Sequence, residues 1–138
     1  MSSLQERLTA VLGEILPVEQ EPDGALTVRH DHTFASLRVV TIADGLDLVS
    51  LTQILAWDLP LDNKIRARVA EHAHNTLLGT VSLVDKAGIA AAKKNSKKTA
   101  DVMLRYNFPG AGLSDDALRT LILMVLSAGA DVRRALLA

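Results

Sequence analysis

The sequence predicts an α+β fold in which helices pack against an antiparallel sheet of about five strands, in the order α-β-β-β-α-β-β-α. Three observations indicate this fold class. Residues 25–57 form a β-rich run that two polar turns divide into three strands, a helical apolar pattern precedes the run, and a longer one ends the chain. With 138 residues, the chain is expected to be one domain, 1–138, that buries a substantial core.

The first predicted helix begins at a capping box, because Ser3 and Glu6 have the Ser-x-x-Glu spacing. Apolar residues then recur on one helical stripe: Leu4, Leu8, Val11, Leu12, Ile15 and Leu16. Pro17 ends this helix. Residues 18–24 carry three carboxylates and a proline, so we expect a surface connection there.

Three strands are predicted at residues 26–28, 37–42 and 46–57, and the Asp44-Gly45 turn joins the last two. These last two strands carry apolar residues at both odd and even positions. An antiparallel sheet with one face in water alternates instead between apolar and polar residues. We therefore expect a cover over part of the second face: the protein's own helices and loops, a second subunit, or a bound peptide.

A second helix is predicted from the N-cap residue Asp62 to about Leu78, with Gly79 as its C-cap. A fourth strand follows at residues 80–84. Residues 89–92 then start a return strand, and the lysine-rich residues 93–98 form a solvated loop.

The strand pattern resumes at residues 101–108, and the pattern does not decide whether 89–92 and 101–108 are one interrupted strand or two. The last helix begins at Ser114, with Asp115 and Asp116 in its first turn, where the helix dipole favours anions. Its middle, around Met124, is apolar on all sides, so we expect burial on more than one side.

Composition favours neither nucleic acid nor a membrane as a partner. The formal net charge is −1, and aromatic residues make up only 3% of the chain, too few for the stacking platforms that bind single-stranded nucleic acid. The chain has no Cys, no pattern of a signal peptide, and no apolar run near the ~20 residues that span a membrane. We therefore expect a cytoplasmic protein.

Histidines occur in two pairs, and neither pair predicts a metal site. His30 and His32 share a face if they lie on a strand, but no third ligand accompanies them, and a polar turn explains both residues. His72 and His74 lie about 200° apart around a helix. Nucleophile-elbow, P-loop and dinucleotide-binding motifs are absent from the sequence. We expect no metal, no cofactor and no enzymatic activity.

The order of elements, together with three segments, resembles the YbjN-like family of the type III secretion chaperone-like superfamily. The segments are the strand Asp-Val-Met-Leu-Arg-Tyr-Asn-Phe at 101–108, the turn Pro-Gly-Ala-Gly-Leu at 109–113 and the helix start Ser-Asp-Asp-Ala-Leu at 114–118. The resemblance covers most of the chain, and the lysine-rich segment departs from the family pattern. It implies helices on a curved antiparallel sheet, a homodimer, and the binding of extended client segments on apolar surface and at sheet edges.

These observations predict a non-enzymatic, chaperone-like domain that binds an extended segment of a client protein. Strand addition at a sheet edge, with side chains entering apolar pockets, is the expected mode. The residues expected to form the binding surface are Leu48, Ile54, Ala56 and Trp57. Two alternatives remain: a structural or regulatory homodimer without a separate client, and a small ligand-binding domain.

Overall fold

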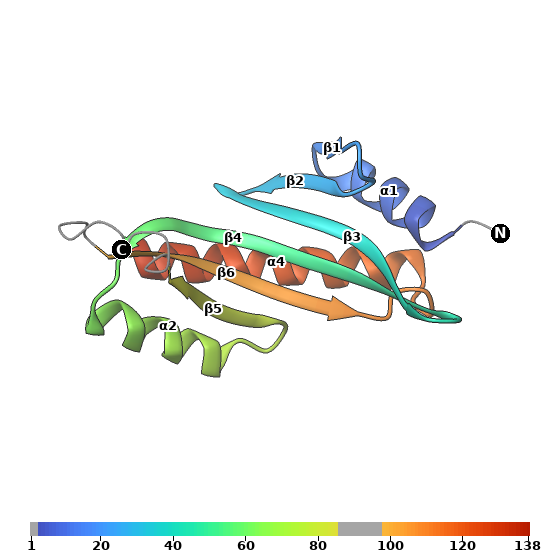
Figure 1. Ribbon diagram of the computed structural model, residues 1–138. Coiled ribbons are helices and arrows are strands. Elements are labelled where there is room, and N and C mark those ends of the chain that lie inside the picture. The colour runs from blue at the N-terminus through green and yellow to red at the C-terminus, as the bar shows by residue number, and fades with distance from the viewer. Residues whose placement is uncertain (1–2, 86–97) are drawn as a thin grey trace.

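The computed structural model describes residues 3–85 and 98–138 and confirms the predicted α+β fold (Figure 1). In chain order, the described elements are α1 (Leu4–Ile15), β1 (Val18–Gln20), β2 (Leu26–His30), β3 (Thr33–Ala43), β4 (Leu46–Pro60), α2 (Asn63–Asn75), β5 (Thr80–Asp85), β6 (Thr99–Phe108) and α4 (Asp115–Leu137). The six strands form one sheet in the order β1-β2-β3-β4-β6-β5, and every neighbouring pair is antiparallel.

The predicted meander is present as β2, β3 and β4. A two-residue turn joins β2 to β3, and both of its residues have positive φ, 47° at Asp31 and 67° at His32. Such backbone angles match the right-handed twist of a hairpin, and Asp and His tolerate them better than most residues. His32 therefore lies in the turn and not beside His30 on the face of a strand. Gly45, with a φ of 76°, turns β3 into β4 as its sequence context predicts.

The sheet has one strand more than expected. Residues 18–20, predicted as part of a surface connection, form β1 because Val18 pairs with Val28 and Gln20 with Leu26. The predicted return strand at 89–92, and the lysine-rich segment up to residue 97, lie outside the described residues. Residues 99–108 form β6.

The described helices leave one face of the sheet uncovered. α4 runs along the sheet behind β4 and β6, and α1 packs against α4 and β3 (Figure 1). α2 lies beside β5 and reaches α4 through Arg68, whose guanidinium donates a hydrogen bond to the carbonyl of Ala135. None of the described helices combines the length and apolarity that crossing a membrane requires.

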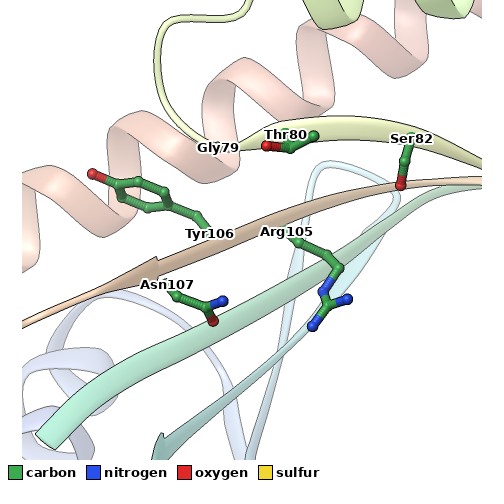
Figure 2. Close-up of a pocket in the computed structure, with 6 residues that line it drawn as sticks. All are labelled: Gly79, Thr80, Ser82, Arg105, Tyr106 and Asn107. Carbon is green, nitrogen blue, oxygen red and sulfur yellow. The ribbon is translucent and has the colours of Figure 1, made fainter.

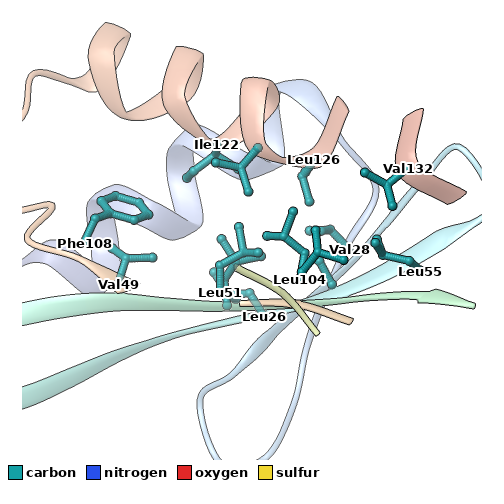
Figure 3. Packing of buried hydrophobic residues seen from close by; sticks show 14 of the residues in the cluster. Leu26, Val28, Val49, Leu51, Leu55, Leu104, Phe108, Ile122, Leu126 and Val132 are labelled. Atoms are coloured by element: carbon teal, nitrogen blue, oxygen red, sulfur yellow. The ribbon is translucent and has the colours of Figure 1, made fainter. Parts of the chain in front are cut away.

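The core lies between the covered face of the sheet and α4. Figure 3 shows Leu51 and Leu104 from the sheet meeting Ile122 and Leu126 from α4. Along β4, the buried side chains are at odd positions: Val49, Leu51, Gln53 and Leu55. A register shift between Ile54 and Ala56 then breaks this alternation, so that Leu55 and Ala56 are both buried.

Gln53 is a polar residue in the centre of this core. Its Nε2 donates to the Thr33 hydroxyl at 2.8 Å and to the Leu126 carbonyl at 3.0 Å, so it links β4 to β3 and α4. The amide fits because Gly129 of α4 has no side chain; a Cβ there would lie 2.6 Å from Gln53 Cδ. Its Oε1 has no hydrogen-bond partner among the described residues.

Candidate functional site

The uncovered face of the sheet, called here the open face, is a surface that the described helices leave free. Its side chains alternate along each strand with those of the core, and the strand register aligns them in rows across the sheet. Successive rows lie two residues apart, or about 7 Å along the strands. The chemistry of the open face can therefore be described row by row.

An aromatic patch occupies one row. Phe34 pairs with Ile54, and Ile54 pairs with Met103 on β6. The Trp57 ring meets the Phe34 ring edge-on, with the centroids 5.8 Å apart, and the two residues are 45% and 36% exposed. The Arg29 guanidinium lies 4.9 Å from the Phe34 ring centroid. The patch, defined as Phe34, Ile54, Trp57 and Met103, thus offers apolar and aromatic contacts to a partner, and Arg29 already makes a cation–π contact with Phe34.

A polar band follows in the next two rows. The first row is Glu19, Thr27, Ser36, Thr52, Arg105 and Thr80, and the second is Arg38, Ser50 and Asn107. Arg38 forms an exposed ion pair with Asp23, with a nitrogen–oxygen distance of 3.0 Å. The Ala25 backbone N–H, followed by the Arg38 guanidinium, lowers the pKa of Asp23 below 3.8. The band is therefore rich in hydroxyls, with Arg105 on β6 as a cation and Glu19 on β1 as a carboxylate at its edge.

A second apolar row lies beyond the polar band, on the hairpin that β3 and β4 form. Val40 pairs with Leu48, and both are at least partly exposed. Toward the tip, Ile42 is 57% exposed. The open face therefore alternates along the strands from apolar to polar to apolar.

A notch interrupts the edge of the sheet next to the polar band. Because Thr80 of β5 pairs with Arg105, residues 106–108 of β6 have no partner on β5. The resulting hollow, of about 570 Å³, is lined by Gly79, Thr80, Ser82, Arg105, Tyr106 and Asn107 (Figure 2). Arg105 and Asn107 extend from one side of β6 and Tyr106 from the other (Figure 2). The notch thus exposes backbone hydrogen-bonding groups beside a cationic side chain.

Three of the four residues predicted for a binding surface lie on the open face, and the fourth lies in the core. Leu48 and Ile54 lie on the open face, in different rows, and Trp57 joins the aromatic patch. Ala56 was predicted wrongly: it is only 1% exposed, because the register shift after Ile54 turns it into the core. The same irregularity lets the odd-numbered Trp57 reach the open face.

Sequence reasoning missed Phe34, Met103 and Arg105 as surface residues. Phe34 precedes the predicted strand 37–42, whereas β3 begins at Thr33. The signal that could have identified all three is alternation with buried neighbours, Ala35 for Phe34 and Val102 and Leu104 for the other two.

A smaller groove lies between α2 and α4, on the helical side of the sheet and away from the open face. Its cavity of about 290 Å³ is lined by residues that include Leu77, which is 88% exposed, and Met124, which is 52% exposed. The middle of α4 was predicted to be buried on more than one side, but within this chain Met124 is left uncovered.

Among the described residues, no three His, Asp or Glu side chains gather closely enough to hold a metal ion. Comparison of the chain with protein-family models, with curated proteins and with solved structures finds no match.

Proposed function

We propose that this chain is a non-enzymatic, chaperone-like domain that binds an extended segment of a client protein on the open face of its sheet. The observation that carries the proposal is the aromatic patch: two aromatic rings, an isoleucine and a methionine on a face that no described helix covers. Aromatic and Met side chains are enriched at protein interfaces, because aromatic rings bury much apolar area and the flexible Met thioether adapts to irregular surfaces.

The polar band explains why the bound partner would be extended. A segment that lies on a sheet face must satisfy its own backbone N–H and C=O groups, because leaving them unpaired is costly. Ser36, Ser50 and Thr52 place hydroxyls along the middle of the face, where they can donate to or accept from such a backbone. The notch at residues 106–108 offers further backbone groups at the edge.

The wider proposal includes a cytoplasmic location and no requirement for a cofactor, nucleic acid or membrane. The net charge of −1 and the absence of Cys support this part. The resemblance of residues 101–118 to the YbjN-like family favours client binding, although a fold does not by itself specify a function.

Trp57 gives a direct test, because it is the only tryptophan in the chain and belongs to the patch. Nine-residue peptides would be selected from a displayed random library on the purified protein, and their binding measured by Trp57 fluorescence. We expect a blue shift on saturation. Ile54→Asp, at the centre of the patch, should weaken binding at least tenfold, since it places a charge in the apolar contact. Leu77→Asp, which places the same charge on an exposed leucine of the groove between α2 and α4, is the control and should bind normally.

Two results would contradict the proposal. One is a library that yields no binder to the wild-type protein. The other is a set of binders whose affinity Ile54→Asp leaves unchanged while Leu77→Asp reduces it, since binding would then belong to the groove between α2 and α4.

A homodimer is the second candidate, and the groove between α2 and α4 favours it. Leu77 and Met124 are large, exposed apolar side chains that both line that groove, where a second copy could bury both. The solution mass tests this candidate. A mass of twice 14.8 kDa that falls to the monomer value in Leu77→Asp would support it, and a monomer at all concentrations would exclude it.

A further inference from the structure

We infer that the segment bound on the open face carries an acidic residue, which Arg105 recognises two positions away from the apolar residue that contacts the aromatic patch. This inference rests on the proposed function and specifies the chemistry of its partner. It follows from the charges of the open face, from the surroundings of Arg105, and from the spacing of the rows.

Three arginines lie on the open face, and two of them already have partners. Arg29 lies over the Phe34 ring, and Arg38 pairs with Asp23. Arg105 forms no ion pair with any carboxylate of the described residues, which include every Asp and Glu of the sequence. An arginine with five hydrogen-bond donors and no carboxylate partner is suited to an anion supplied by another molecule.

Hydroxyl groups surround Arg105 on both neighbouring strands. Thr52 of β4 and Thr80 of β5 lie directly opposite Arg105 in the register. Neither threonine makes a side-chain hydrogen bond within the described part of the chain, so both hydroxyls can donate to an added carboxylate. A guanidinium between two free hydroxyls can hold both oxygens of one carboxylate.

The spacing of the rows determines how far apart the apolar and acidic residues of the bound segment must be. Met103, Arg105 and Asn107 follow one another at intervals of two residues, about 7 Å, which is also the spacing of same-side residues in an extended peptide. A segment aligned with β6 therefore places an apolar side chain on the aromatic patch and a carboxylate on Arg105 two positions later. Val40 and Leu48, about 20 Å from the patch along the strands, accept a second apolar residue six positions from the first.

The experiment selects nine-residue peptides from a displayed random library on the wild-type protein and on Arg105→Gln, which keeps most of the length of the side chain but removes the charge. Circular dichroism would first establish that the variant folds. We expect wild-type binders to be enriched in Asp or Glu two positions from an apolar residue, and binders of the variant to lack this enrichment. Replacing that Asp by Asn in a selected peptide should weaken wild-type binding about tenfold and leave binding to Arg105→Gln unchanged.

The outcomes separate the inference from the function on which it rests. Binders that depend on Ile54 but show no acidic preference would overturn the inference and leave the proposed function in place. An acidic preference that persists in Arg105→Gln would overturn the assignment of Arg105. If neither protein yields binders that Ile54→Asp abolishes, both the inference and the proposed function fail.

Discussion

The two faces of β4 are both rich in apolar residues, but they differ in how deeply those residues are buried. On the covered face, Val49, Leu51 and Leu55 are fully buried against the helices. On the open face, Leu48 and Ile54 remain partly exposed, with hydroxyl residues between them. The covered face supplies the apolar burial that stabilises the fold, and the open face contributes much less of it. Its apolar residues are therefore available for binding.

Among variants that still fold, the largest expected difference between the two faces of β4 is in the free energy of unfolding. Leu51→Ala removes a fully buried side chain and leaves a cavity, so we expect a loss of about 3 kcal/mol in the free energy of unfolding. Thr52→Ala, the next residue but on the open face, should change it by about 0.5 kcal/mol or less. Urea unfolding curves measure both values. Equal losses for the two variants would show that the faces do not differ in their contribution to the fold.

A second test concerns Gln53, the buried polar residue of β4 on the covered face. Gly129→Ala places a methyl group against the Gln53 amide, and we expect a loss of about 2 kcal/mol from overpacking. In a Gln53→Ala background the amide is gone, so the same glycine substitution should cost far less. A double-mutant cycle from urea unfolding measures this coupling, and additive effects would exclude a direct contact between the two residues.

The covered face was largely predictable from the sequence because its signals are local. Helical periodicity and N-caps define α1, α2 and α4, and the N-cap residues Ser3, Asp62 and Ser114 each accept the expected backbone hydrogen bond. The sequence did not reveal β1, whose three residues become a strand only by pairing with β2. Strand pairing is a tertiary contact, and so short a segment carries little periodicity of its own.

The open face was predictable only in part, because one irregularity changes which residues belong to it. Strict alternation along β4 would place Ala56 beside Ile54 and Trp57 in the core. The register shift after Ile54 reverses both assignments, and Asp58, with a φ of 53°, continues the irregular backbone. No local signal marks this position, since bulges depend on how two strands are matched in length and twist.

A third test compares the same substitution on the two faces of β4, to distinguish residues needed for folding from residues needed for binding. Ile54→Asp lies on the open face, so we expect it to lower the free energy of unfolding by only about 1 kcal/mol while weakening peptide binding at least tenfold. Leu55→Asp places the same carboxylate in the core, where Leu55 is 0% exposed, and should prevent folding. Circular dichroism and urea unfolding of the two variants provide the comparison. An unfolded Ile54→Asp protein would mean that the open face is needed for the fold.

The smallest expected effect concerns the ion pair that flanks the polar band. The pKa of Asp23 is lowered in the folded protein, first by the Ala25 backbone N–H at 3.1 Å and then by Arg38. A lowered folded-state pKa contributes stability above the unfolded-state pKa, here near 3.8, and this contribution is lost as the pH falls through the folded-state value. Wild type should therefore exceed Asp23→Asn slightly in urea midpoint at pH 6, and the difference should shrink as the pH falls below 3.8. Because Asp23 and Arg38 are both exposed, high salt should also reduce the part of the difference that comes from Arg38. A difference that stays constant from pH 6 to pH 2 would assign the effect to the shape of the turn at residues 21–24 and not to the charge of Asp23.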